Sequence, residues 1–128
     1  WPSGELGRRQ FERRFEVIME TFECVLGITS APESFDVMPF VEEIVTLKLA
    51  ACVKVFPVGI SVFRWKNKLE KQQERIILIK TTASCVTELS RRLRLFHPDE
   101  VPEFVVLPIV GGNPNFLKWV TESTAAFD

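Results

Sequence analysis

Apolar and polar residues alternate with a period of two over several short segments of the chain, which is the pattern of half-buried β-strands. In residues 21–29, Phe22, Cys24, Leu26 and Ile28 alternate with Thr21, Glu23, Val25 and Gly27. The segment S-A-P-E-S that follows predicts a turn. Further strands are predicted at residues 52–57, 60–66, 68–81 and 101–109.

The segments 60–66 and 68–81 are separated by Asn67 alone, which predicts a hairpin because asparagine tolerates the left-handed backbone conformation. The second of these strands is polar at its start and continuously apolar at its end, I-I-L-I-K. We therefore expect its first half to leave the core and its second half to enter it.

Apolar residues recur at helical spacing in two other segments, 35–51 and 84–96. Ser34 and Ser84 are the candidate N-caps of these helices. Pro39 is compatible with the first helix only near its start, so that helix either is distorted in its first turn or begins at Pro39. Asn113-Pro114 predicts the start of a short last helix, with asparagine as the cap.

The predicted order is strand, helix, strand, strand, helix, strand and a small helix, which is the split β-α-β pattern of the ferredoxin-like α+β class. Residues 1–16 alternate arginines with glutamates and are expected to form a charged tail, and residues 17–128 a single domain.

The later strands carry apolar side chains toward both faces of the predicted sheet, at residues 76–79 and again at 104–107. Two helices cover only one face, so the other would expose more apolar surface than a monomer usually does. A second copy of the same sheet is the expected cover, which predicts a homo-oligomer. A third helix or the N-terminal tail is the alternative cover.

Composition narrows the functional classes. The chain has 128 residues, of which 46% are hydrophobic and 26% charged, enough to bury a core. The formal net charge is −1, so we expect no nucleic-acid partner. No apolar run is long enough to predict a transmembrane segment. The first ten residues resemble no signal peptide, but an upstream segment could have been removed before Trp1. A cytoplasmic or organellar location is favoured, and membrane association through a partner stays open.

Candidate catalytic and metal-binding chemistry is sparse. The three cysteines are widely spaced, with no C-x-x-C pair, and His97 is the single histidine. A closed structural metal site in one chain is therefore not expected. No nucleophile–base pair and no glycine-rich phosphate loop is legible, so the sequence predicts no enzymatic activity.

Residues 20–123 resemble the CutA (divalent-cation-tolerance) family through an ordered set of short segments. The segments are T-S-A-P-E, L-K-L-A-A-C-V, S-V-F-R-W-K-N-K-L-E, E-R-I-I-L-I-K-T-T, H-P-D-E-V-P-E and L-P-I-V-G-G-N-P-N-F-L-K-W-V. The resemblance implies a ferredoxin-like subunit, a homotrimer, and association with copper and other divalent cations. It also implies a distant, PII-like relation to trimeric signal proteins that bind small ligands between subunits. Animal members are associated with the anchoring and maturation of acetylcholinesterase, and no catalysis is established for the family.

The chain departs from the family at the positions of its bacterial copper ligands. The ligand cysteine corresponds to Thr29, and the pair of histidines to Phe96 and His97. Neither threonine nor phenylalanine replaces a soft or imidazole donor. The resemblance is therefore to a divergent animal paralogue in which the metal chemistry has weakened.

Two candidate sites follow. His97 with Glu100, Glu103 or a residue of a neighbouring subunit could hold copper or another divalent cation weakly. The alternative is that His97 only interacts with the carboxyl end of the helix before it.

The second candidate is a cleft between subunits, lined by Trp65, Lys68 and Lys80 together with the same glutamates. The alternative is that Trp65 packs in an interface and the two lysines are solvated edge charges.

The predicted function is a trimeric, copper-binding, divalent-cation-tolerance protein without catalysis. The alternative is an interaction or scaffold protein that helps to localise or mature a partner such as acetylcholinesterase. Sensing of a small anion between subunits is a third hypothesis.

Overall fold

A computed structural model describes residues 9–10, 13 and 22–125. The tail expected over residues 1–16 falls, apart from residues 9, 10 and 13, outside the described residues. The elements in chain order are β1 (Cys24–Pro32), α2 (Met38–Thr46), β2 (Cys52–Val55), β3 (Gly59–Trp65), β4 (Lys68–Thr82), a 3₁₀ turn η1 (Ala83–Cys85), α3 (Val86–Phe96), β5 (Phe104–Pro108) and α4 (Pro114–Glu122).

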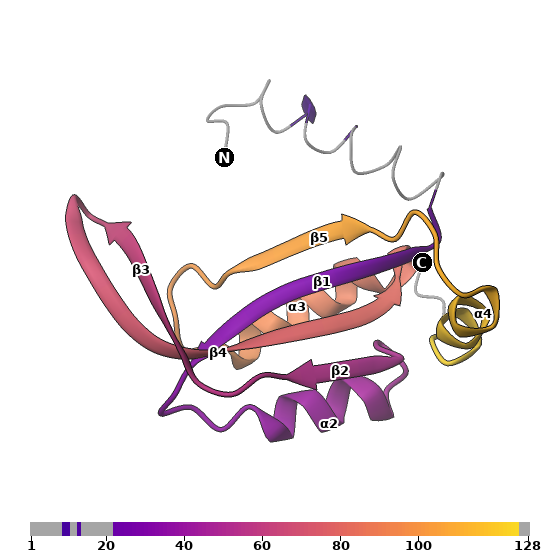
Figure 1. The fold of residues 1–128 in the computed structure, drawn as a ribbon, viewed down its shortest axis with the longest axis horizontal. Helices are drawn as coiled ribbons and strands as arrows, with labels where there is room; N and C mark the ends of the chain where they lie inside the picture. Colours follow the sequence, from indigo (N-terminus) through magenta and orange to yellow (C-terminus); the bar gives the residue numbers. More distant parts are fainter. Residues whose placement is uncertain (1–8, 11–12, 14–21, 126–128) are drawn as a thin grey trace.

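The strands form one antiparallel sheet in the order β2-β4-β1-β5, with β3 also paired to β4 (Figure 1). The central pair is β1 and β4, which are far apart in sequence. The predicted α+β class, with an antiparallel sheet and three helices, is confirmed, and the strand order is the one that a split β-α-β pattern produces.

The core lies between one face of this sheet and the helices α2 and α3. Ile77 and Ile79 of β4 pack with Ile44 of α2 and with Leu89 and Leu93 of α3. All five side chains are almost completely buried. Their positions follow the two periodicities that predicted the elements, because alternate residues of a strand share one face and so do every third or fourth residues of a helix.

The long hairpin of β3 and β4 extends past the core, at the opposite end of the sheet from α4 (Figure 1). Its turn is made by Lys66 and Asn67, which have positive φ angles of 50° and 65°, as a two-residue type I′ turn requires. The sequence prediction of a turn at Asn67 is confirmed. The register across the turn places Trp65 opposite Lys68.

The sheet face away from α2 and α3, here called the open face, carries an apolar cluster. Its members are Leu26, Ile28, Ile76, Leu78, Val105 and Leu107, which the strand register places on the side opposite Ile77 and Ile79. Ile76 and Val105 are each 47% exposed. The expectation that these strands are apolar on both faces is confirmed.

The helix boundaries differ from the predictions. Pro39 stands in the first turn of α2, one of the arrangements that the sequence allowed, but α2 ends at Thr46 and not at residue 51. The chain leaves the helix there because Lys48 adopts a φ of 62°. Ser34 does not cap α2; instead the Asp36 Oδ1 atom accepts the Met38 N–H at 3.1 Å.

Other boundaries were also shifted. Ser84 lies in the turn η1, so it does not cap α3, which begins at Val86. The turn predicted at residues 30–34 is partly wrong, because β1 continues to Pro32 in register with β4. The cap at Asn113 is confirmed, since its Oδ1 atom accepts the Asn115 N–H at 3.0 Å. Among the described residues, no helix is both long and apolar enough to cross a membrane.

Candidate functional site

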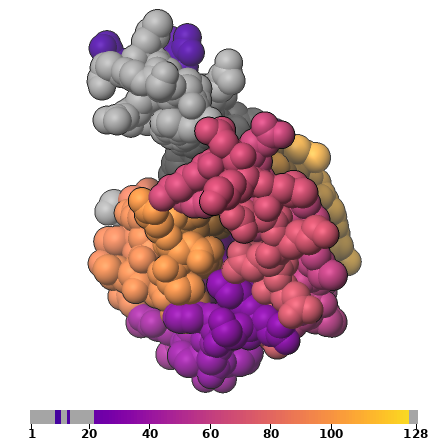
Figure 2. Space-filling view, turned by 90° about the vertical axis from the view of Figure 1, so that its left-hand side faces the viewer, coloured from indigo at the N-terminus to yellow at the C-terminus, as the bar shows by residue number. Residues whose placement is uncertain are grey.

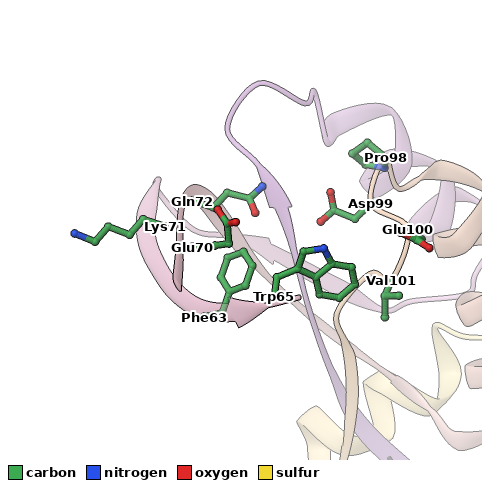
Figure 3. Close-up of a pocket in the computed structure, with 9 residues that line it drawn as sticks. All are labelled: Phe63, Trp65, Glu70, Lys71, Gln72, Pro98, Asp99, Glu100 and Val101. Carbon is green, nitrogen blue, oxygen red and sulfur yellow. The ribbon is translucent and has the colours of Figure 1, made fainter. Parts of the chain in front are cut away.

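A cavity of about 460 Å³ lies between the β3–β4 hairpin and the loop that connects α3 to β5 (Figure 3). The hairpin contributes Phe63, Trp65, Glu70 and Gln72, and the loop contributes residues 98–101. Figure 2 looks onto this end of the molecule, where the hairpin lies beside the segment that leads into β5. The volume is within the range of small-molecule sites.

His97 fixes the start of that loop. It caps α3 with an extended ψ of 137°, as expected for a residue before proline, and its N–H donates to the Leu93 carbonyl at 2.8 Å. Its side chain is only 2% exposed. The imidazole reaches across to β1, where its Nε2 lies 2.6 Å from the Ser30 carbonyl oxygen, while its Nδ1 lies 3.0 Å from the Asp99 backbone N.

These two partners determine the tautomer of His97. The Asp99 N–H is a donor, so Nδ1 accepts, and the Ser30 carbonyl is an acceptor, so Nε2 carries the hydrogen. A metal-binding imidazole needs a free nitrogen lone pair. Both His97 nitrogens are engaged in protein hydrogen bonds, so a metal ion would bind this ring in place of the Ser30 carbonyl or the Asp99 N–H.

Thr29, a second of the three positions implied by the family resemblance, is also engaged in a hydrogen bond. Thr29 is fully buried, and its hydroxyl donates to the Glu103 carbonyl at 2.6 Å. The Ser30 hydroxyl donates to the Glu103 Oε1 atom at 3.4 Å. Thr29 and Glu103 therefore fasten the start of β5 to β1.

Within residues 9–10, 13 and 22–125, no three His, Cys, Asp or Glu side chains are grouped so as to hold a metal ion. His97 and Glu103 both approach Ser30, but each makes hydrogen bonds there. Glu100 lines the cavity instead. Within one chain, His97 and Glu103 thus lie at Ser30, whereas Glu100 lies at the cavity.

The predicted cleft residues are separated in a similar way. Trp65 and Glu100 meet at the cavity, and Lys68 lies opposite Trp65 at the hairpin turn. Lys80 is near the far end of β4, where its ammonium group lies 5.5 Å from the centre of the Phe116 ring on α4. A single chain therefore does not bring Lys80 to Trp65.

Sequence reasoning missed Phe63, Glu70, Gln72 and Asp99 as cavity residues. The alternation on the hairpin contained a usable signal, because Phe63, Trp65, Glu70 and Gln72 share one face once the turn is placed at residues 66–67. The position of Asp99 depends on the path of the loop after His97, and no sequence pattern indicated it.

Comparison with known proteins finds relatives that carry the same name, CutA. A Xenopus laevis protein named "Protein CutA homolog" is 49% identical over 77 residues, which are 60% of this chain and 51% of that protein. The Mus musculus "Protein CutA" is 42% identical over 63% of this chain and 46% of its own length. The chain thus spans about half the length of these animal relatives.

Solved structures agree in fold. The divalent cation tolerance protein Cut A1 from Thermus thermophilus superimposes with a TM-score of 0.75 at 34% identity, covering 80% of this chain and 99% of that one. CutA1 from Oryza sativa gives a TM-score of 0.77 at 32% identity, covering 82% and 96%. Residues 25–123 also match the family described as CutA1 divalent ion tolerance protein. This chain belongs to the CutA1 family, whose name refers to divalent-cation tolerance.

Proposed function

We propose that this chain is the subunit of a homotrimeric CutA-type protein that binds divalent cations, copper among them, only weakly and through carboxylates. The observation that carries the proposal is the apolar open face of the sheet, together with family membership. The proposal includes no catalytic step.

The open face supports self-association. Ile76 of β4 and Val105 and Leu107 of β5 are 44–47% exposed. They lie on the same face of the sheet, and Leu26 and Ile28 of β1 lie between the two strands on that face. Exposed contiguous apolar surface on a folded domain marks an interaction site. A copy of the same face is a chemically matched cover, and burial would stabilise the assembly by roughly 25 cal/mol for each Å² of apolar surface removed from water.

The hairpin supports the same conclusion. Ile60 and Leu69 are 72% and 73% exposed although they lie on paired strands. Among the described residues, β3 is paired only to β4, so its outer edge could offer backbone groups for pairing with another chain.

Light scattering tests the assembly directly. The expected solution mass is three times the 14.7 kDa of one subunit. The variant Val105→Asp places a charge in the open face and should dissociate the assembly. Leu95→Asp is the matched control, because Leu95 is 75% exposed on α3 and lies outside the open face. A wild-type mass of one subunit would overturn the proposal.

The cation part of the proposal rests on Glu100 and Glu103, which are exposed carboxylates beside the site where His97 is engaged. Carboxylates bind divalent cations, but without imidazole or thiolate they hold copper weakly. A neighbouring subunit would supply the remaining ligands.

Copper titration and spectroscopy separate the ligands. Isothermal titration with Cu²⁺ should show weak binding that the Glu100→Gln and Glu103→Gln substitutions reduce further. The electron paramagnetic resonance spectrum of the copper-loaded protein should lack the nitrogen splitting of a bound imidazole. Imidazole splitting that disappears in His97→Gln would make His97 the ligand and refute the carboxylate assignment.

A further inference from the structure

We propose that the cavity between the hairpin and the α3–β5 loop binds an organic cation, a ligand with an alkylammonium head group. This site goes beyond divalent-cation tolerance and requires neither the assembly nor the metal binding proposed above. The proposal rests on the combination of an open cavity, an aromatic surface and carboxylates that form no ion pair with lysine or arginine in the described part of the chain.

The aromatic surface is made by Phe63 and Trp65, alternate residues of β3 that lie next to one another in the cavity (Figure 3). The two side chains are 38% and 41% exposed, so part of each ring is open to a ligand. The face of an indole or phenyl ring attracts a cation through its quadrupole, and indole is the best of the aromatic side chains. The Lys66 ammonium group already lies 5.8 Å from the Trp65 ring centre, although Lys66 does not line the cavity.

The carboxylates are Glu70 from the hairpin and Asp99 and Glu100 from the loop. In the described part of the chain, none of the three forms an ion pair with lysine or arginine. The His97 Nδ1 atom is 3.9 Å from the Asp99 Oδ2 atom, but it accepts a hydrogen bond and so carries no proton to offer. Of the described residues that line the cavity, Lys71 is the one basic residue, and its side chain points away from the others in Figure 3.

The loop wall is held in place before any ligand arrives. His97 is buried and ties the loop to β1 through Ser30, and its second nitrogen fixes the backbone of Asp99. A site whose polar groups are already positioned loses less entropy on binding. His97 thus acts as a positioning residue for the acidic wall of the cavity.

The same features disfavour other ligands. The lining holds three carboxylates and one lysine, and two further lysines, Lys66 and Lys68, lie at the hairpin turn outside it, so the lining itself is acidic and disfavours an anion. A bare divalent ion needs several oxygen ligands within about 2.0–2.6 Å, and within one subunit the described residues of this lining are not grouped in that way, so a divalent ion here would depend on ligands from a second subunit whereas an organic cation would not. A cation with methyl or methylene groups can contact the two rings, and the volume leaves room for it.

Tetramethylammonium chloride is a suitable probe, followed through the indole N–H signal of Trp65 in a ¹H–¹⁵N spectrum assigned with Trp65→Phe. Sodium chloride at equal ionic strength controls for salt, and tert-butanol controls for a neutral ligand of similar shape. The expected result is a saturable shift of the Trp65 signal with tetramethylammonium alone. The double variant Glu70→Gln/Asp99→Asn should weaken binding about tenfold, equivalent to about 1.4 kcal/mol.

Two further variants sharpen the test. Lys66→Asn removes a neighbouring positive charge and suits the positive φ at that position, so binding should tighten. Glu42→Gln removes an exposed carboxylate on α2, far from the lining, and should leave binding unchanged. No saturable shift, an equal response to tert-butanol, or an equal loss in Glu42→Gln would overturn the proposal.

Discussion

The His97 Nε2–H donates a hydrogen bond of 2.6 Å to the carbonyl oxygen of Ser30, joining the end of α3 to the middle of the sheet across 67 positions of sequence. This contact occupies one nitrogen of the single histidine in the chain, and the Asp99 N–H occupies the other. At this place in the fold the imidazole links structural elements.

Replacing this imidazole should lower the free energy of unfolding. In His97→Ala, the buried Ser30 carbonyl loses its donor and a void is left beside it, at a cost of about 2–3 kcal/mol. Urea denaturation followed by circular dichroism measures the change. Leu95→Ala on the same helix is the control, because Leu95 is 75% exposed and its removal should change stability by less than about 0.5 kcal/mol. Equal stability of His97→Ala and wild type would contradict the structural role.

Replacing Lys48 by glycine should raise the free energy of unfolding. Lys48 holds a φ of 62°, where a side chain is strained, and the Leu49 N–H still bonds to the Ile44 carbonyl at 2.8 Å around it. Lys48→Gly should therefore stabilise the protein by about 0.5–1 kcal/mol. Lys48→Ala keeps the Cβ atom and should give no such gain, so similar midpoints for the two variants in urea would refute this explanation.

Glu88 should make the free energy of unfolding depend on pH in the acid range. Hydrogen bonds from Arg91 first, and then from Arg92, lower the pKa of the Glu88 carboxyl to about 2 from an ordinary value of 4.5. Because the folded-state pKa lies below the unfolded-state value, the stabilisation is complete above about pH 4.5 and is lost as the pH falls toward 2.

Carboxyl NMR titration should place the Glu88 midpoint well below those of solvated glutamates. The stability difference between wild type and Glu88→Gln should be largest near neutral pH and shrink across this acid window. A difference that is constant with pH would show that the two arginines do not hold the carboxylate.

The three thiols should differ in reactivity. Cys85 is fully buried, and its Sγ lies 2.9 Å from the Ala125 carbonyl oxygen. Burial, and secondarily the charge of Glu23, raises the pKa of the Cys24 thiol, which reduces its thiolate fraction. Cys52 is the half-buried one. Brief alkylation with iodoacetamide, read by mass spectrometry, should label Cys52 first; early labelling of Cys85 would contradict the packing of the C-terminal segment.

The hairpin was the element best predicted from sequence. Its two strands were placed at 60–66 and 68–81 and are observed at Gly59–Trp65 and Lys68–Thr82. The turn residue and the alternation on either side of it are local features of the sequence, so they predict the hairpin without knowledge of the rest of the fold. The Asn113 cap succeeded for the same reason.

The errors lie where distant residues decide the outcome. The end of α2 is set by Lys48, which adopts a left-handed backbone conformation. A glycine at this position would have predicted the end of the helix, but a lysine does not. The end of β1 is set by pairing with β4, which extends the strand through a segment whose composition predicted a turn. Local propensity gives way when long-range hydrogen bonds are available.

The sequence alone determined the class of the fold, the order of its elements and the apolar character of both sheet faces, because periodicity and turn residues act over a few neighbouring positions. Only the tertiary structure decided the chemistry around His97. The partners of its two nitrogens are backbone groups of Ser30 and Asp99. Every residue has these backbone groups, so the residue types at positions 30 and 99 could not predict the two hydrogen bonds. The cavity beside them likewise exists only once the hairpin and the α3–β5 loop meet in space.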